Sequence, residues 1–139
     1  MANKIREAVL DASVLVQSVI EERYTDSVLQ FLRDLKRAYA PSLILYEMGG
    51  VLAKSASREL MTPEDALRKY NLVKSTPILE IGEPEMEHAM KIAVGYTMTF
   101  YDASYVALAM ETDTVLVTAD RGLSRKAKGM VKALHAEEL

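Results

Sequence analysis

Two short apolar runs in this sequence each end in an aspartate. Residues 8–10 (Ala-Val-Leu) lead into Asp11, and residues 114–119, which are rich in β-branched side chains, lead into Asp120. Runs of this length and composition predict buried strands. Helical segments separate them, and strands alternating with helices form a parallel sheet covered on both faces. We therefore expect an α/β fold in which both aspartates lie at the sheet's carboxyl edge, where such sheets bind ligands.

Two further acids fall on predicted helices. In one helix Leu43, Glu47 and Val51 recur four residues apart, so the carboxylate shares a stripe with apolar side chains. Asp102 opens an alanine-rich apolar helix whose small residues suggest close packing on the sheet. Hard divalent cations bind carboxylate oxygens. If the fold gathers these two acids with the two strand-end aspartates, the result is a pocket for Mg²⁺ or Mn²⁺.

The sequence around these acids predicts the helices and strands that connect them. Thr62 followed by Pro63 has the chemistry of a helix start, and Ser42 is a plausible cap for the helix that carries Glu47. We predict strands at about 6–11, 38–41, 78–81, 114–119 and 131–134. We predict helices at about 13–22, 25–37, 42–58, 63–74, 83–94, 102–110 and 121–128.

Composition narrows the class of protein. A chain of 139 residues that is half hydrophobic fits one compact domain over residues 1–139. It has no cysteine and only two histidines, His88 and His135. Any metal would therefore be held by oxygen ligands, and we assign no role to either histidine. A formal charge of −3 argues against non-specific binding of nucleic acid, although a local basic rim stays open. Without a signal-peptide core or an apolar span of membrane length, we expect a cytoplasmic protein.

Structural explanations compete with metal binding for each acid. Aspartate is a common helix cap, so Asp11, Asp102 and Asp120, each taken alone, favour a cap. A cap does not account for Glu47, because an acid within a helix on an apolar stripe costs desolvation free energy unless it has a partner. A salt bridge with a buried arginine is the structural alternative for Glu47.

Hydroxyl and basic residues near the strand ends have two interpretations as well. Ser13 and Thr118 lie two residues from Asp11 and Asp120, so their hydroxyls could orient a carboxylate or satisfy local backbone groups. Basic residues follow Asp120 and could hold a phosphate backbone or simply face solvent, and we favour the solvated face because a charge count alone decides little. The candidates for a phosphate contact are Arg121, Arg125 and Lys126.

Four segments together carry a resemblance to a known family. They are VLDASVL at residues 9–15, the helix start that leads to Glu47, YDASYVALA at 101–109 and LVTAD at 116–120. Their order and spacing resemble the PIN-domain ribonucleases, especially VapC-type toxins of toxin–antitoxin pairs. The resemblance implies a three-layer α/β/α sandwich with a mostly parallel central sheet. It maps the family's acidic metal site onto Asp11, Glu47, Asp102 and Asp120, with Ser13 and Thr118 as supporting residues.

The resemblance also implies a function. Members of the family bind Mg²⁺ or Mn²⁺ and cut RNA with a metal-activated water, as homodimers held in check by a VapB-like antitoxin. This sequence departs from the family at Gly122, where many members have a further acid two residues after the last aspartate. The number of metal ions therefore stays open.

Two other functions stay open at this point. The missing acid at Gly122 is consistent with a PIN-like module that binds RNA or a protein without cutting it. Asp11 as a phosphoacceptor, as in receiver domains or haloacid-dehalogenase-type phosphatases, is the weaker alternative. Those families place another acid beside the strand-end aspartate or two residues after it, where this chain has Ala12 and Ser13.

Overall fold

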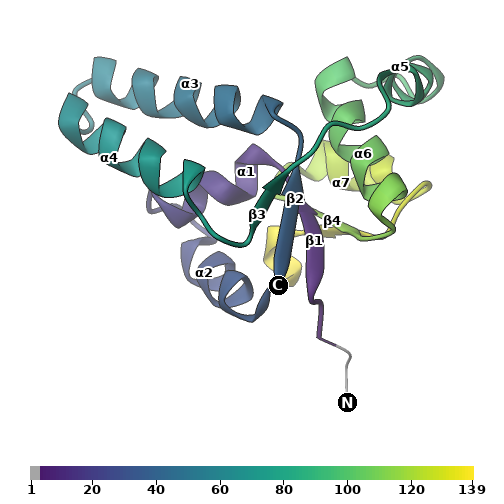
Figure 1. Ribbon diagram of the computed structural model, residues 1–139, viewed down its shortest axis with the longest axis horizontal. Helices are drawn as coiled ribbons and strands as arrows, with labels where there is room; N and C mark the ends of the chain where they lie inside the picture. The colour runs from purple at the N-terminus through teal and green to yellow at the C-terminus, as the bar shows by residue number, and fades with distance from the viewer. Residues whose placement is uncertain (1–3) are drawn as a thin grey trace.

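The computed structural model describes residues 4–139 and shows a parallel sheet between two layers of helices (Figure 1). Five strands lie in the order β3-β2-β1-β4-β5, and each neighbouring pair is parallel. The strands are β1 (Glu7–Leu10), β2 (Arg37–Ala40), β3 (Leu79–Ile81), β4 (Val115–Thr118) and β5 (Ala133–His135). The predicted α/β sandwich is confirmed, with a sheet that is parallel at every described strand pair.

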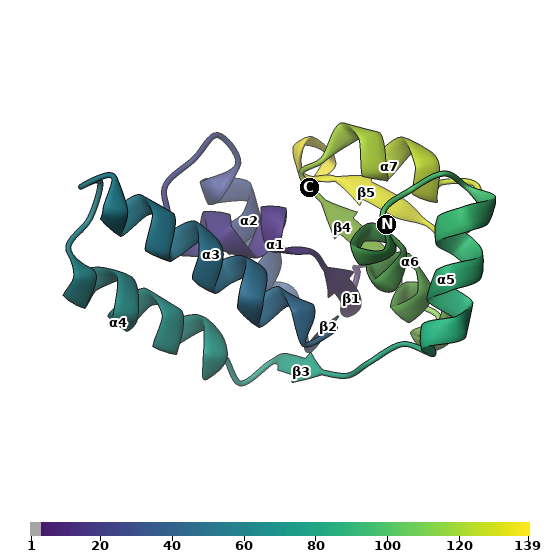
Figure 2. The same cartoon turned by 90° about the horizontal axis from the view of Figure 1, so that it is seen from above.

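Helices connect each strand to the next. They are α1 (Ala12–Leu15), α2 (Thr25–Asp34), α3 (Leu43–Ser57), α4 (Pro63–Lys74), α5 (Met86–Gly95), α6 (Phe100–Thr112) and α7 (Arg121–Ala127), with 3₁₀ turns η1 (Val16–Ser18) and η2 (Ala136–Glu138). Parallel strands are joined by right-handed crossovers. The chain winds outward from β1 to β3 and then returns to β4, so α1 to α4 cover one face and α5 to α7 the other (Figure 2).

The first helical segment is shorter than the sequence predicts. Helical structure after β1 ends at Ser18 rather than near residue 22. The backbone groups that would have continued the helix have tertiary partners instead, because Lys69 Nζ donates to the carbonyl of Val19 at 2.7 Å. The Tyr24 N–H donates to the side chain of Gln17 at 2.8 Å. The contact with Lys69 joins residues 50 positions apart, so the local sequence pattern does not reveal it.

The two predicted helix starts have different outcomes. At α4, Thr62 Oγ1 accepts a hydrogen bond from the Asp65 N–H at 3.1 Å and the helix begins at Pro63, as predicted. At α3 the predicted cap is wrong, since the Ser42 side chain makes no capping hydrogen bond. The Ser42 backbone is already helical, and its N–H donates to Glu83 Oε1 at 2.7 Å. A carboxylate from the loop after β3 therefore holds the start of α3.

The core lies on both faces of the central strands. β1 and β4 contribute residues with no solvent exposure, such as Val9 and Leu116. Helix α6 contributes seven consecutive buried residues, from Ala103 to Ala109, which explains its small side chains. Helices α3 and α4 form an antiparallel hairpin that extends away from the sheet (Figure 1). No helix within residues 4–139 is long and apolar enough to cross a bilayer.

Candidate acidic site at the carboxyl edge of the sheet

The sheet places Asp11 and Asp120 beyond the ends of adjacent strands. β1 and β4 are direct neighbours, with Leu10 paired to Val117, and the Asp11 N–H donates to the Val117 carbonyl at 3.3 Å. The chain proceeds from β1 toward one edge of the sheet and later returns to β4 on the other side, so the two strands flank the switch point of the fold. Ligands of such sheets bind beyond the strand ends at this point.

Asp11 is buried, with 7% of its surface exposed. Two hydroxyls hold its carboxylate: Ser13 Oγ donates to Oδ1 at 2.5 Å and Thr118 Oγ1 donates to Oδ2 at 2.7 Å. The side chain makes no capping hydrogen bond to α1, so the interpretation of Asp11 as a cap is wrong.

The two hydroxyls serve both roles that the sequence left open. Ser13 Oγ also accepts a hydrogen bond from the Ala119 N–H at 2.8 Å. Thr118 Oγ1 accepts one from the Asp120 N–H at 3.0 Å. One hydrogen-bond network therefore both orients the Asp11 carboxylate and holds the backbone that follows β4.

Burial raises the pKa of Asp11 to about 6 from its ordinary value of 3.8. The hydrogen bonds from Ser13 and Thr118 oppose this rise, and the nearby charge of Glu47 adds to it. Asp11 and Glu47 therefore form one pair of mutually repelling carboxylates. Within residues 4–139, neither carboxylate forms a salt bridge with a basic side chain.

Glu47 lies at the margin of the buried face of α3 rather than on it. That face consists of Ile44, Met48 and Leu52, whereas Val51 is 38% exposed, so the predicted apolar stripe is offset by one position. The partner of Glu47 is also different from the expected arginine. Tyr105 Oη, on α6, donates to Glu47 Oε1 at 2.5 Å.

Tyr105 is the residue of the site that sequence reasoning missed. It is 2% exposed, and burial together with its bond to Glu47 raises the pKa of its hydroxyl above the ordinary range. A buried tyrosine needs a partner for its hydroxyl, and Tyr105 lies one helical turn after Asp102. These two facts were the available signal, although they do not identify Glu47 as the partner.

Tyr105→Phe is expected to lower the apparent affinity for Mn²⁺ about tenfold, because groups that orient a metal ligand have effects of this size. Tyr39→Phe is the matched control, since Tyr39 Oη donates to Glu7 Oε1 at 2.9 Å on an exposed part of the sheet. Thermal shift of the metal-free and Mn²⁺-loaded proteins measures both effects. Equal Mn²⁺ affinity in the two variants would show that the Glu47 bond has no role in metal binding.

Asp102 and Asp120 form a second acidic pair. Asp102 lies in the first turn of α6, whose cap is Thr99: Thr99 Oγ1 accepts from the Asp102 N–H at 3.0 Å. The cap interpretation is therefore wrong for Asp102. It is correct for Asp120, whose Oδ1 accepts from the Leu123 N–H at 3.1 Å. Burial first, and then repulsion by Asp120, raises the pKa of Asp102.

The two pairs do not close into a complete ligand set. Among residues 4–139, no three acidic or histidine side chains are grouped in a way that could hold a metal ion by themselves. The donor chemistry still fits Mg²⁺ or Mn²⁺, because every candidate ligand is a carboxylate oxygen and none of the four is neutralised by a salt bridge in this part of the chain. Mg²⁺ commonly uses one or two carboxylates and completes its shell with water and substrate phosphate.

The basic residues after Asp120 have different surroundings. Arg121 pairs with Glu137 through two hydrogen bonds of 2.6 Å, which raises its pKa further. Lys126 Nζ donates to the Thr97 carbonyl at 2.7 Å, close enough to Asp102 to lower the pKa of that acid slightly. Arg125 lines a hollow of about 310 Å³ together with Arg121. Arg121 and Lys126 are thus partly committed to partners within the chain.

His135, to which the sequence assigned no role, supports the loop before Asp120. It is buried, and its Nε2 lies 3.0 Å from the Ala119 carbonyl. Its Nδ1 accepts from the Glu137 N–H at 3.1 Å, so the proton is on Nε2, which donates to Ala119. A single histidine near the end of a chain gives no sign of such a contact in the sequence.

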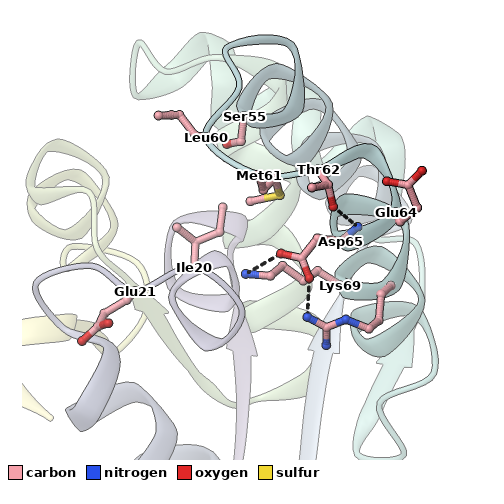
Figure 3. A pocket seen from close by; sticks show the side chains of 10 residues that line it. Ile20, Glu21, Ser55, Leu60, Met61, Thr62, Glu64, Asp65 and Lys69 are labelled. Carbon is pink, nitrogen blue, oxygen red and sulfur yellow. Dashed lines mark hydrogen bonds and ion pairs between the residues drawn. The ribbon is translucent and has the colours of Figure 1, made fainter.

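A larger hollow lies away from the acids, between the loop after η1 and the α3–α4 hairpin near its turn (Figure 3). Its volume is about 610 Å³, and none of the four acids lines it. Asp65 pairs with both Arg68 and Lys69 at its wall, which neutralises the charge there. Both basic side chains of this hollow are therefore paired with Asp65.

Comparison with known proteins assigns the family. A model of the PIN domain matches residues 8–129, so the chain belongs to the PIN domain family. The chain is 38% identical over 90 residues to exonuclease VapC9 of Pyrobaculum aerophilum, which covers 64% of this chain and 66% of that protein. It is 27% identical over 127 residues to ribonuclease VapC3 of the same organism, covering 88% and 96%.

Solved structures agree with this family assignment. The crystal structure of PAE2754 from Pyrobaculum aerophilum superposes with a TM-score of 0.73 and 30% identity, over 96% of this chain and 93% of that one. The structure of VapBC2 from Rickettsia felis bound to a promoter DNA fragment gives a TM-score of 0.69, over 93% and 98%. Its identity is 16%, so this second likeness concerns the fold alone.

Proposed function

We propose that this protein is a divalent-metal-dependent endoribonuclease, the toxin of a VapBC-type pair. The observation that carries the proposal is the position of two acid pairs at the carboxyl edge of the sheet: Asp11 and Asp120 follow the adjacent strands β1 and β4, Glu47 lies near Asp11, and Asp102 lies near Asp120. A bound cation stabilises carboxylates that repel one another. Relatives named as VapC ribonucleases supply the substrate class.

In this proposal the four acids hold Mg²⁺ or Mn²⁺, directly or through water. The metal would lower the pKa of a bound water and offset charge that develops on the phosphodiester. Ser13 and Thr118 keep both oxygens of Asp11 at fixed positions. Tyr105 restrains Glu47 from the opposite helix. These three groups position the acids and are not proposed to react.

Substrate binding is proposed to involve the basic residues after Asp120. Arg121, Arg125 and Lys126 all follow that acid on α7, so a phosphate backbone that crosses the site passes near them. Arg121 would exchange its contact with Glu137 for phosphate, which is feasible because the ion pair is exposed.

Cleavage of RNA with and without metal tests the proposal. Purified protein, free of any bound antitoxin, is incubated with a pool of structured and single-stranded RNA in Mn²⁺, Mg²⁺ or EDTA. We expect endonucleolytic products only in the metal-containing samples. Retention of intact RNA that is equal in EDTA and Mn²⁺ would contradict the nuclease assignment.

A second candidate function is a PIN-like module that binds RNA or protein without cutting. Two observations favour it: the position two residues after Asp120 is Gly122, and the described acids do not form a closed ligand set. A Cβ at Gly122 would lie 3.2 Å from Asp120 Oδ1, so an acid there would crowd the existing carboxylate. The same metal-dependence experiment separates the two functions.

The proposed partners follow from the family. We expect a homodimer and a VapB-like antitoxin that blocks the acidic site, and we expect both to act in the cytoplasm. Light scattering of the purified protein, alone and with the product of a neighbouring antitoxin gene, measures both assemblies.

A further inference from the structure

We propose that Tyr46 and Tyr101 are stacking platforms for unpaired RNA bases on the two sides of the acidic site. The proposal rests on the nuclease function proposed above and names the form of substrate that this site accepts. Its basis is the position and exposure of the two side chains.

The chain has seven tyrosines, and among residues 4–139 only three of them are exposed. Tyr46 is 78% exposed and Tyr101 is 62% exposed, and each directly precedes one of the four acids, Glu47 and Asp102. The third, Tyr96, lies at the end of α5, shortly before α6 begins. Two of the three exposed tyrosines therefore lie next in sequence to an acid of the proposed site.

The direction of Tyr101 follows from the contact between Tyr105 and Glu47. Residues four apart on a helix lie on the same face, so Tyr101 lies one turn before Tyr105 on α6. Tyr105 reaches across to Glu47 on α3. Tyr101 thus belongs to the side of α6 that faces α3, one turn farther toward the start of the helix, where the chain becomes exposed to solvent.

Tyr46 lies in the first turn of α3 and directly precedes Glu47 in the sequence. Both views show that α3 and α6 begin on opposite sides of the end of β1 (Figures 1 and 2). In the described part of the chain, neither tyrosine hydroxyl has a hydrogen-bond partner. The two exposed tyrosines therefore belong to the first turns of the helices that begin on either side of the end of β1.

Unpaired bases are the ligand that this arrangement fits. Bases of single strands stack on exposed aromatic side chains without requiring a particular sequence, and each such contact changes affinity by roughly tenfold or more. Bases within an A-form duplex are already stacked and paired, so they do not reach the rings. A chain with a net charge of −3 also gains little affinity from the phosphates alone, which makes stacking a larger share of binding.

Cleavage kinetics of two alanine variants test the proposal. With a single-stranded RNA that the wild type cleaves in Mn²⁺, Tyr46→Ala and Tyr101→Ala are each expected to raise KM about tenfold with kcat within about threefold of wild type. Tyr46→Phe and Tyr101→Phe should keep the wild-type KM, because stacking needs the ring and not the hydroxyl. Leu67→Ala, at a position on α4 that is also 62% exposed, is the control for loss of a surface apolar group.

A binding experiment keeps the two proposals separable. An oligonucleotide carrying 2-aminopurine is titrated with the Asp11→Asn variant, with and without each tyrosine substitution, and stacking is detected as fluorescence quenching. Quenching that disappears in the alanine variants supports the platforms even if no RNA is cut. Unchanged KM and unchanged quenching in both alanine variants would overturn them, as would equal cleavage of the same sequence in a duplex.

Discussion

Asp11→Asn is expected to reduce metal-dependent cleavage of RNA by at least about 1,000-fold, because it removes a charge from the position where a metal would be held. Asp11 is the most enclosed of the four acids, and hydroxyls from Ser13 and Thr118 fix both of its oxygens. Asparagine has nearly the same shape, so the protein is expected to stay folded. The loss of cleavage then measures the effect of removing the charge and not an effect on packing.

Asp34→Asn is the matched control, since Asp34 is an exposed acid at the end of α2. It should cleave RNA like the wild type. Thermal shift with Mn²⁺ provides a second reading: the wild type and Asp34→Asn should be stabilised by the metal, and Asp11→Asn should not. Full cleavage by Asp11→Asn in Mn²⁺ would remove Asp11 from the proposed catalytic set.

The parts of this fold that could be predicted from the sequence are those encoded by local periodicity. Apolar runs that end in Asp11 and Asp120 are strands in the structure, and parallel topology then requires both ends to lie at one edge. The start of α4 at Pro63 is encoded by adjacent residues in the same way. Such features need no knowledge of the tertiary contacts.

The roles of single side chains could not be predicted, because they depend on contacts between distant residues. Tyr105 and Glu47 are 58 positions apart, and nothing in either helix alone shows that they meet. Ser42 has the composition of a cap, but a carboxylate 41 positions away takes over its backbone N–H. The cap preference of aspartate is correct at Asp120 and wrong at Asp11 for the same reason. Propensity gives the average behaviour of a residue type, and tertiary partners decide the individual case.

The same burial that suits Asp11 for a metal site is expected to destabilise the metal-free protein at neutral pH. The pKa of Asp11 is about 6 in the folded state, above its ordinary value of 3.8, so between these values the folded state binds more protons than the unfolded state. Stability therefore falls as pH rises through this window. The size of the loss is about 3 kcal/mol, nearly complete by pH 7.

Comparison with Asp11→Asn isolates this effect from other titrations. Glu137 contributes with the opposite sign, because its ion pair with Arg121 lowers its pKa from the ordinary value of 4.5 to about 2, and its stabilisation is lost as pH falls between these two values. Urea unfolding in EDTA should show Asp11→Asn gaining on the wild type by about 2.4 kcal/mol between pH 4 and pH 7. Asp34→Asn should follow the wild-type curve. Parallel curves for the wild type and Asp11→Asn would mean that the ionised Asp11 carboxylate does not lower the free energy of unfolding. The proposal that the four acids need a cation to offset their charge would then lose its support.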